Sequence, residues 1–366
     1  IRNNLKILNI LTEEGKINEN APSDFVGLDR FDARKKILEK LSSSGLLVKE
    51  ENIKNKVPYG DRSNSIIEPF LTEQWFVDAK KLSIKAKQIV KSKKTNFFPV
   101  NWTKTYFQWM NNIEPWCISR QLWWGHQIPA WYGPDKKVFV ADTEQNAKKK
   151  AKKFYKKNVK LVRDQDVLDT WFSSGLWPFA TLGWPKNNYF LKKFYPTSVL
   201  VTGFDIIFFW VARMIMFGME FMKNEPFKDI YVHALVRDEK GQKMSKSKGN
   251  VIDPLELIEK YSADALRFTL LSMASPGRDV KLSEDRVKGY RNFLNKLWNA
   301  NNFLIQNKCV FKNNKKIPKH KININKWILS KLLETKVNLE NNMKDYRFDE
   351  AARNIYQFVW HQYCDW

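Results

Sequence analysis

Two short apolar runs flank a long apolar stretch in the middle of the chain, and this order limits the fold more than any other feature. The runs are Val199–Val201 and Ile230–Val232, and residues 206–221 lie between them. Buried strands that alternate with helices are typical of parallel sheets in α/β folds. Because Arg213 and Glu220 interrupt the central stretch, it predicts a buried helix and not a membrane span.

Small and polar residues directly follow both predicted strands. Gly203 and Asp205 come after the first strand, and His233 comes after the second. Ligands of open α/β sheets bind outside the carboxyl ends of the strands, so these residues are candidates for a binding site. A carboxylate such as Asp205 can pair with an ammonium group or cap the following helix, and the sequence leaves both roles open.

A basic, glycine-flanked loop lies further along the chain and reads Lys243-Met244-Ser245-Lys246-Ser247. Ammonium groups, hydroxyls and loop N–H groups together suit a polyphosphate such as ATP. They would also stabilise the charge that develops on a leaving pyrophosphate. An ordinary solvated loop has a similar composition, so these five residues alone do not decide the question.

The segment after this loop has the pattern of a capped helix. Asp253 is a favourable N-cap, Pro254 suits the first helical position, and Glu256 completes a capping box. A second helical pattern begins near Ser262. The basic loop therefore ends against a helix N-terminus, which also favours anions.

Several segments together resemble class I aminoacyl-tRNA synthetases, and among them the valyl-tRNA synthetase family. The resemblance covers almost the whole chain and keeps the family's order. The matching segments are residues 116–126, 166–178, 202–214, 241–254, 264–267 and 274–279.

This resemblance implies an α/β chain with three parts. Residues 1–70, with short strands and a helix over Arg30–Leu41 expected, correspond to the tail of the editing insertion. Residues 71–285 correspond to the second half of a Rossmann-like catalytic domain, with the ATP loop at 243–247. Residues 286–366 correspond to a helical stem-contact region and the start of the anticodon-binding domain, interrupted by a loop over Asn307–Lys321.

The resemblance also assigns site residues. It implies that Lys243 and Lys246 act in catalysis and that an aromatic pocket with one carboxylate holds valine. Either tryptophan of that pocket taken alone is more often a core residue, in a chain with 15 of them. The implied ATP-binding residues are Gly203, His233, Lys243, Met244, Ser245, Lys246 and Ser247, and the implied valine-binding residues are Trp171, Asp205, Ile206 and Trp210.

The implied function is that of a valine–tRNA ligase, which uses ATP with Mg²⁺ to activate L-valine and transfers it to tRNA(Val). Editing of misactivated threonine is expected in the full-length enzyme. An isoleucyl- or leucyl-tRNA synthetase and a non-catalytic tRNA-binding fragment remain the alternatives. The chain opens on Ile1 and lacks the family's histidine-rich phosphate motif, so we expect this piece alone to be inactive. We expect a cytoplasmic monomer without a membrane partner.

Composition adds weaker constraints. The net charge of +24 fits a polyanionic partner such as RNA, or a lysine-rich coding bias. The lysine run at residues 148–157 predicts a solvated helix face in preference to an RNA contact. The three cysteines form no CxxC pair, and residues 57–65, where many relatives carry cysteines, contain none. We therefore expect reduced thiols and no protein-bound zinc.

Overall fold

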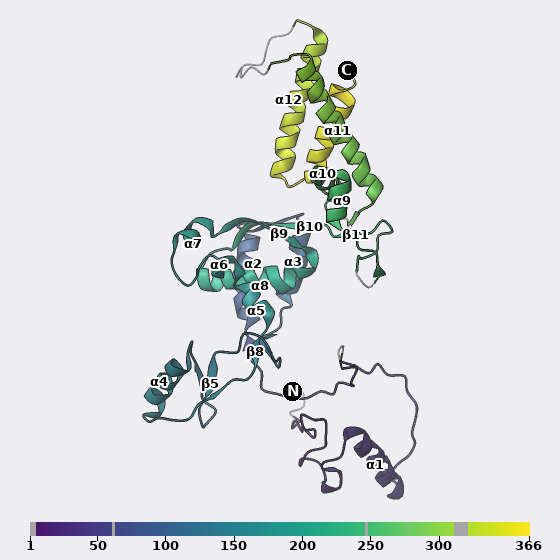
Figure 1. Cartoon of the computed structure of the whole chain (residues 1–366). Coiled ribbons are helices and arrows are strands. Elements are labelled where there is room, and N and C mark those ends of the chain that lie inside the picture. Colours follow the sequence, from purple (N-terminus) through teal and green to yellow (C-terminus); the bar gives the residue numbers. More distant parts are fainter. Residues whose placement is uncertain (1–4, 61–62, 246–247, 278, 311–320) are drawn as a thin grey trace. The chain divides into compact units, whose positions relative to one another are not determined.

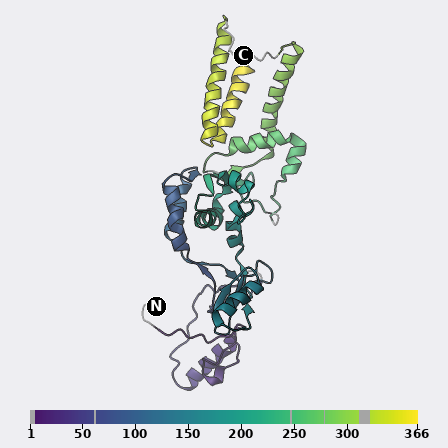
Figure 2. The same cartoon turned by 90° about the vertical axis from the view of Figure 1, so that its left-hand side faces the viewer.

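The computed structural model describes residues 5–60, 63–245, 248–277, 279–310 and 321–366 (Figure 1, Figure 2). It divides the chain into two compact units, Ile1–Trp75 and Phe76–Trp366. Of the residues assigned from the sequence, Lys246 and Ser247 lie outside the described residues.

The first unit has one long helix, α1 (Arg30–Ser43), and the short 3₁₀ helix η1 (Ser23–Phe25). The helix predicted over Arg30–Leu41 is confirmed, and Asp29 caps it by accepting a hydrogen bond from the Phe31 amide at 2.8 Å. The expected short strands are not formed within the described part of this unit, which holds only isolated bridges. Its buried core is small, so little apolar surface is available to stabilise a sheet; that core consists of Ile17, Phe25 and Ala33.

A three-stranded parallel sheet lies at the centre of the second unit. Its order is β2 (Asn96–Phe98), β10 (Phe227–His233) and β9 (Thr197–Gly203). Within the sheet, Ile230 pairs with Phe97 on one side and with Leu200 on the other. Both strands predicted from the apolar runs are confirmed, and so is their parallel arrangement. Their predicted burial is confirmed for Leu200, Ile230 and Val232 but is wrong for Val201, which is 60% exposed.

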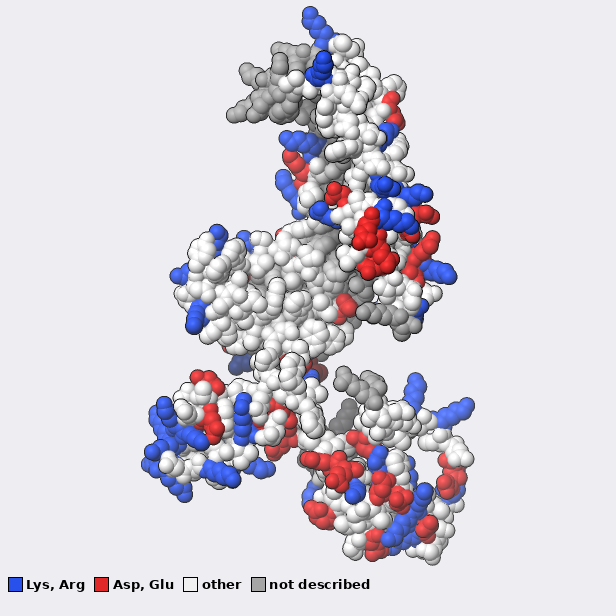
Figure 3. Space-filling view, in the orientation of Figure 1, with Lys and Arg blue, Asp and Glu red and all other residues white. Residues whose placement is uncertain are grey.

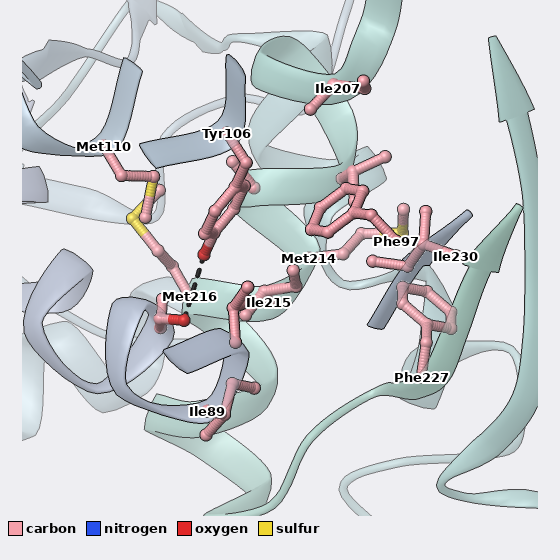
Figure 4. Packing of buried hydrophobic residues seen from close by; sticks show 14 of the residues in the cluster. Ile89, Phe97, Tyr106, Met110, Ile207, Met214, Ile215, Met216, Phe227 and Ile230 are labelled. Atoms are coloured by element: carbon pink, nitrogen blue, oxygen red, sulfur yellow. Dashed lines mark hydrogen bonds between the residues drawn. The ribbon is translucent and has the colours of Figure 1, made fainter. Parts of the chain in front are cut away.

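Helices pack against this sheet through a continuous apolar core (Figure 4). They are α2 (Ala79–Lys91), α3 (Trp102–Asn111) and α8 (Ala212–Phe217). Tyr106 is fully buried in this core, and its hydroxyl donates to the Ala86 carbonyl at 3.0 Å, which satisfies its polar atom (Figure 4). Each large side chain buried here contributes about 1.5–3 kcal/mol, which fixes the sheet in place. Examples are Phe97, Met214, Ile215, Phe227 and Ile230.

The apolar stretch after β9 is helical, as predicted, but its geometry changes along its length. A 3₁₀ turn, η2 (Phe204–Ile206), leads into the π-helical η3 (Ile207–Val211), then α8, then the π-helical η4 (Gly218–Met222). Every residue of α8 is buried. π-Helical turns occur frequently at functional sites because the extra residue redirects neighbouring side chains.

Short elements connect the strands of the sheet. The lysine run lies on α4 (Glu144–Tyr155), which buries Ala147 and Ala151, and Figure 3 shows the basic side chains gathered there on the surface. This arrangement supports the predicted solvated helix face. The other elements are β1 (Phe76–Val77) paired with β3 (Trp116–Cys117), β4 (Ser119–Arg120) paired with β8 (Val167–Leu168), the sheet β6 (Val138–Val140), β5 (Ala130–Tyr132), β7 (Val162–Arg163), and the helices α5 (Thr170–Gly175), α6 (Trp177–Ala180) and α7 (Tyr189–Phe194).

The remainder of the second unit is mainly helical. The predicted cap is confirmed, because α9 begins at Pro254 and Asp253 accepts from the Leu255 amide at 2.8 Å. Most of the loop predicted over Asn307–Lys321 lies outside the described residues; α11 ends at Gln306 and α12 begins at Asn323. The elements are β11 (Val236–Arg237) paired in parallel with β12 (Val280–Lys281), α9 (Pro254–Tyr261), α10 (Ala263–Met273), α11 (Glu284–Gln306), α12 (Asn323–Lys344), α13 (Phe348–Phe358) and the π-helical η6 (Val359–Tyr363).

Candidate functional site

The carboxyl ends of β9 and β10 bring three of the sequence-assigned residues together. Gly203 is the register partner of His233 across the two strands. A Cβ atom added to Gly203 would lie 2.6 Å from Oδ1 of Asp205 and 3.8 Å from Cε1 of His233. Gly203 has ordinary extended dihedral angles, so the lack of a side chain here serves to leave space and not to relieve backbone strain.

Asp205 presents an exposed carboxylate at this edge. It lies inside η2 and is the N-cap residue of neither η2 nor η3, whose N-caps are Gly203 and Ile206. Its pairing with an ammonium group stays a prediction. His233 is also exposed, and its Nδ1 lies 2.9 Å from the Ala234 carbonyl oxygen, which orients the imidazole ring.

Trp171 lies in the first turn of α5. Its indole stacks on the ring of Phe209 with centroids 6.0 Å apart. Its amide donates to Oδ1 of Asp169, the N-cap of α5, at 3.2 Å. Trp171 is partly exposed, so one face remains available to a ligand.

Trp210 lies in the π-helical η3, directly after Phe209. Its indole Nε1 donates to the Ser174 carbonyl in α5 at 2.9 Å. Ile206 is half-buried just before η3. The structure therefore joins the two elements that carry Trp171 and Trp210, while a single cavity lined by both indoles stays a prediction.

Asp169 is a functional candidate that no sequence pattern indicated; the structure shows it as the N-cap of α5. Its carboxylate is buried and accepts a hydrogen bond from Trp116 Nε1 at 2.9 Å. Arg120 Nη2 lies 3.2 Å and Arg213 Nη1 lies 3.7 Å from the same carboxylate oxygen, Oδ2. A buried carboxylate thus joins three separate segments next to the predicted pocket.

The described part of the basic loop is held by side-chain hydrogen bonds. The Ser245 amide donates to Oδ1 of Asn250 at 2.9 Å, and Asn250 Nδ2 donates to Oδ2 of Asp238 at 2.9 Å. This hydrogen bond from Asn250 is the largest cause that holds the pKa of Asp238 below its ordinary value. Gly249 has φ of +65°, a left-handed conformation that glycine adopts readily.

The loop is also attached to the helical core behind it. Met244 packs against the cluster formed by α9, α10 and the start of α11, while the side chain of Lys243 is exposed. Asn250 is a second residue that sequence reasoning missed, although an asparagine beside a glycine in a tight loop is a recognisable feature. Met244 and Ser245 are therefore held in place by these contacts, while the Lys243 ammonium group is exposed.

A cavity of about 650 Å³ lies elsewhere, between α10, α11 and α13. Its lining includes Ser272, Arg286, Tyr290 and Arg353, and it contains none of the residues assigned from the sequence. Because this cavity lies away from the carboxyl edge of the sheet and contains none of the assigned residues, it is not the candidate site. The candidate site consists of the sheet edge and the basic loop.

The described residues contain no group of three or more histidine, cysteine or acidic side chains placed to hold a metal ion. Within the same residues, no helix is long and apolar enough to cross a membrane. No disulfide joins Cys117, Cys309 or Cys364 within the described part of the chain.

Family models match most of this chain. The model described as tRNA synthetases class I (I, L, M and V) matches residues 14–283, and the anticodon-binding domain of tRNA ligase matches residues 325–366. The chain belongs to the class I tRNA synthetases. The predicted fold class is thereby confirmed, with a class I catalytic domain followed by a helical anticodon-binding domain. The boundaries drawn at residues 70 and 285 remain predictions.

The sequence is similar to valine–tRNA ligases from several bacteria. It is 80% identical to that of Pelagibacter ubique (strain HTCC1062) over 365 residues, covering 100% of this chain and 42% of the relative. It is 56% identical to that of Bradyrhizobium diazoefficiens, covering 94% and 38%, and 53% identical to that of Caulobacter vibrioides, covering 100% and 40%. The chain thus spans about two fifths of the length of the curated relatives it matches.

Solved class I synthetases have the same fold. Mycobacterium tuberculosis methionyl-tRNA synthetase in complex with methionyl-adenylate superposes with a TM-score of 0.60 at 18% identity, covering 83% of this chain and 54% of that one. A leucyl-tRNA synthetase from Agrobacterium radiobacter K84, in a ternary complex with tRNA, superposes with a TM-score of 0.57 at 18% identity, covering 68% and 36%. At these identities the likeness establishes the fold alone.

Proposed function

We propose that this chain is part of a valine–tRNA ligase, which activates L-valine with ATP and transfers the valyl group to tRNA(Val). The observation that carries the proposal is the 80% identity, along the whole chain, with a protein named valine–tRNA ligase. The exposed Asp205 carboxylate at the end of β9 supports it, because an amino-acid substrate brings an ammonium group that needs a carboxylate partner.

In the proposed first step, the carboxylate of valine attacks the α-phosphorus of ATP, and pyrophosphate leaves. No general base is required, because the attacking carboxylate is already ionised. Asp205 would hold the ammonium group, and the missing side chain of Gly203 would leave room beside it. Catalysis then depends on the positioning of the two reactants and on charge stabilisation.

The basic loop would stabilise the leaving pyrophosphate. Lys243 presents an exposed ammonium group on a loop whose base is fixed by Asn250. Lys246 and Ser247 are assigned to the same role by the family resemblance. The ATP would enter as its magnesium complex, in which phosphate oxygens and water hold most of the metal's coordination sites. A hydroxyl of the terminal adenosine of the tRNA then attacks the acyl carbon of valyl-adenylate; the new ester bond forms as the bond to the phosphate breaks, and AMP leaves.

The walls of the proposed valine pocket explain which amino acids it accepts. Trp171, Ile206 and Trp210 are rigid or branched side chains that limit its volume, so overpacking by isoleucine costs about 1–3 kcal/mol. Threonine has the shape of valine, and the valyl enzyme is itself the known example in which binding favours valine by only about 10². That value comes from the enzyme class and not from this structure. Hydrolytic editing in the full-length enzyme belongs to the proposal for this reason.

An isoleucyl- or leucyl-tRNA synthetase is the nearest alternative, and a non-catalytic tRNA-binding module is the more distant one. The test is amino-acid-dependent pyrophosphate exchange by the full-length protein, translated from the complete coding sequence. We expect valine to give the highest kcat/KM, ahead of isoleucine, leucine, threonine and methionine. A preference for isoleucine or leucine would replace the assignment, and no exchange with any amino acid would favour the non-catalytic module.

The same assay tests the loop with two variants. Lys246→Ala and Lys243→Ala should each slow exchange strongly, because a charge-assisted contact to the pyrophosphate contributes about 1.5–3 kcal/mol. The affinity for tRNA should change little. Normal exchange by both variants would show that this loop does not bind the nucleotide.

A further inference from the structure

The buried Asp169 carboxylate, at the start of α5, contacts two segments that are far from it in the sequence: residues 116–120 and α8. Trp116 donates to it from β3, 53 residues away, and Arg120 lies beside it from β4. The Asp169 amide donates to the Ile118 carbonyl at 2.7 Å, so the backbone is attached at the same point. Arg213 approaches it from α8. Asp169 and Arg213 are only 6% and 7% exposed, so solvent screens this charge pair weakly.

Arg213 depends on this carboxylate. Its guanidinium carbon lies 3.7 Å from the ring centroid of Trp116, a close cation–π contact. Its Nη1 atom is buried and has no hydrogen-bond partner among the described residues. Burial lowers the pKa of Arg213 to about 10, against the opposing effect of Asp169. Without Asp169, a buried cation would be left without its counter-charge, which is strongly unfavourable.

The pair is connected to both predicted walls of the amino-acid pocket. On one side, Asp169 caps the Trp171 amide at the start of α5. On the other side, the Arg213 guanidinium lies 5.7 Å from the ring centroid of Phe209, and that ring stacks on Trp171. Trp210 follows Phe209 and binds the other end of α5 through the Ser174 carbonyl. The helix that carries one wall is therefore fixed at both ends to the element that carries the other wall.

A buried ion pair contributes little net stability, because desolvation of two charges offsets most of their attraction. A well-packed apolar pair would hold the two helices equally well. What the charged pair adds is a directional constraint, because the carboxylate must face the Trp116 indole, the Arg213 guanidinium and the amide of Trp171 at the same time.

We propose that Asp169 and Arg213 are positioning residues that set the separation of Trp171 and Trp210, and thereby the size limit of the amino-acid pocket. This inference rests on the proposed function. Neither residue would touch the substrate; both would act by holding α5 against η3 and α8. Loss of the pair should relax the pocket, so that the enzyme discriminates less well against a larger amino acid.

The test is Asp169→Asn in the full-length protein. Asparagine keeps an oxygen that can cap α5 and has nearly the same shape, but it lacks the charge. We expect the ratio of kcat/KM for valine to that for isoleucine to fall by about tenfold or more, while the KM for ATP changes less than about twofold. A valine-to-isoleucine ratio equal to that of the wild type would overturn the proposal. A fall in kcat/KM of the same size for valine, isoleucine and ATP would also overturn it.

Asp349→Asn is the matched control. Asp349 is also a buried aspartate paired with an arginine, Arg347, in the first turn of a helix, but it lies in α13. It should affect stability without changing the valine-to-isoleucine ratio. If this control changes the ratio as much as Asp169→Asn does, discrimination responds to general loosening and the proposed role is wrong.

A double variant covers the case in which Asp169→Asn does not fold. Asp169→Asn with Arg213→Met removes both charges, so no unpaired cation remains buried, and folding should be recovered. The double variant should still discriminate poorly against isoleucine; wild-type discrimination would overturn the proposal. Valine activation by the wild-type protein tests the proposed function separately, since its absence says nothing about the ion pair.

Discussion

Gly203 lies directly opposite His233 at the carboxyl edge of the parallel sheet, and the space that its missing side chain leaves adjoins the Asp205 carboxylate. The two strands are formed by residues far apart in the sequence, yet their register brings these groups within a few ångströms. The edge therefore holds a carboxylate and an imidazole next to a backbone position without a side chain, an arrangement that suits the proposed zwitterionic substrate.

Gly203→Ala should impair amino-acid activation without unfolding the protein. The dihedral angles of Gly203 suit alanine, so the backbone is not strained, but the new methyl group would lie 2.6 Å from Oδ1 of Asp205. The carboxylate must then rotate away from its position. Loss of one charge-assisted hydrogen bond costs about 1.5–3 kcal/mol, so kcat/KM for valine should fall by roughly tenfold to a hundredfold in pyrophosphate exchange.

The KM for ATP distinguishes this explanation from general damage. It should stay near the wild-type value, because the methyl group displaces Asp205 and not the basic loop. A variant with normal kcat/KM for valine would show that Asp205 does not bind the amino group.

The local patterns in the sequence were sufficient for the strands and the helix cap, but not for the ion pair. Val199–Val201 and Ile230–Val232 predict strands because a short apolar run is a signal contained in neighbouring residues. Which of these side chains is buried depends on the rest of the fold, and Val201 is exposed. Asp253 predicts a cap because its partner is two residues away. The partners of Asp169 are Trp116, 53 residues before it, and Arg213, and no periodic pattern connects them.

Local sequence patterns were also insufficient for the first unit and for the predicted pocket. Short strands were expected in the first unit, but its small core cannot bury the side chains that a sheet requires. The pocket residues Trp171 and Trp210 were identified by resemblance, since a tryptophan alone does not indicate whether it faces a ligand or a core. Their attachment to each other through Ser174 became evident only from the structure.

Gly175→Ala should destabilise the chain. Gly175 ends α5 where it packs on α8, and an added Cβ would lie 2.8 Å from Cδ2 of Phe217, which is itself buried. The ring has no free space to move into, so overpacking should cost about 1–3 kcal/mol in the free energy of unfolding. Urea unfolding of the chain, followed by tryptophan fluorescence, measures this value.

Gly289→Ala is the control for that measurement. Gly289 lies in α11, and an added Cβ would meet no atom within 4 Å. Alanine should stabilise the helix there by about 0.5–1 kcal/mol through its higher helix propensity. If both variants shift the urea midpoint in the same direction, the close approach of α5 and α8 is not what requires Gly175.

Ile206→Ala should shift the amino-acid preference toward isoleucine. Ile206 is half-buried at the end of η2, next to Asp205, and its truncation enlarges the predicted pocket. One more methylene in the substrate gains about 0.8 kcal/mol when buried, so the isoleucine-to-valine ratio of kcat/KM should rise about fourfold. Ile215→Val, in the core of α8, should leave the ratio unchanged. Equal ratios for Ile206→Ala and the wild type would remove Ile206 from the pocket.

Glu284 should make the free energy of unfolding depend on pH in the acidic range. It receives hydrogen bonds from Lys260 and, at 2.6 Å, from the Tyr261 hydroxyl, and thereby connects the end of α9 to the start of α11. The hydrogen bond from Lys260, followed by that from Tyr261, holds the pKa of Glu284 below its ordinary value of 4.5. Because the unfolded chain binds this proton more readily, the stabilisation is complete above about pH 4.5 and is lost as the pH falls through the lower pKa of the folded state.

Glu284→Gln tests this dependence, since glutamine keeps an acceptor oxygen but cannot ionise. Its urea midpoint should lie below that of the wild type at pH 7, and the difference should shrink as the pH falls below about 4.5. Glu259→Gln, on the exposed face of α9, should show no such convergence. A difference between Glu284→Gln and the wild type that stays constant from pH 7 to pH 3.5 would mean that its charge does not stabilise the junction. The loss would then come from the altered hydrogen bond alone.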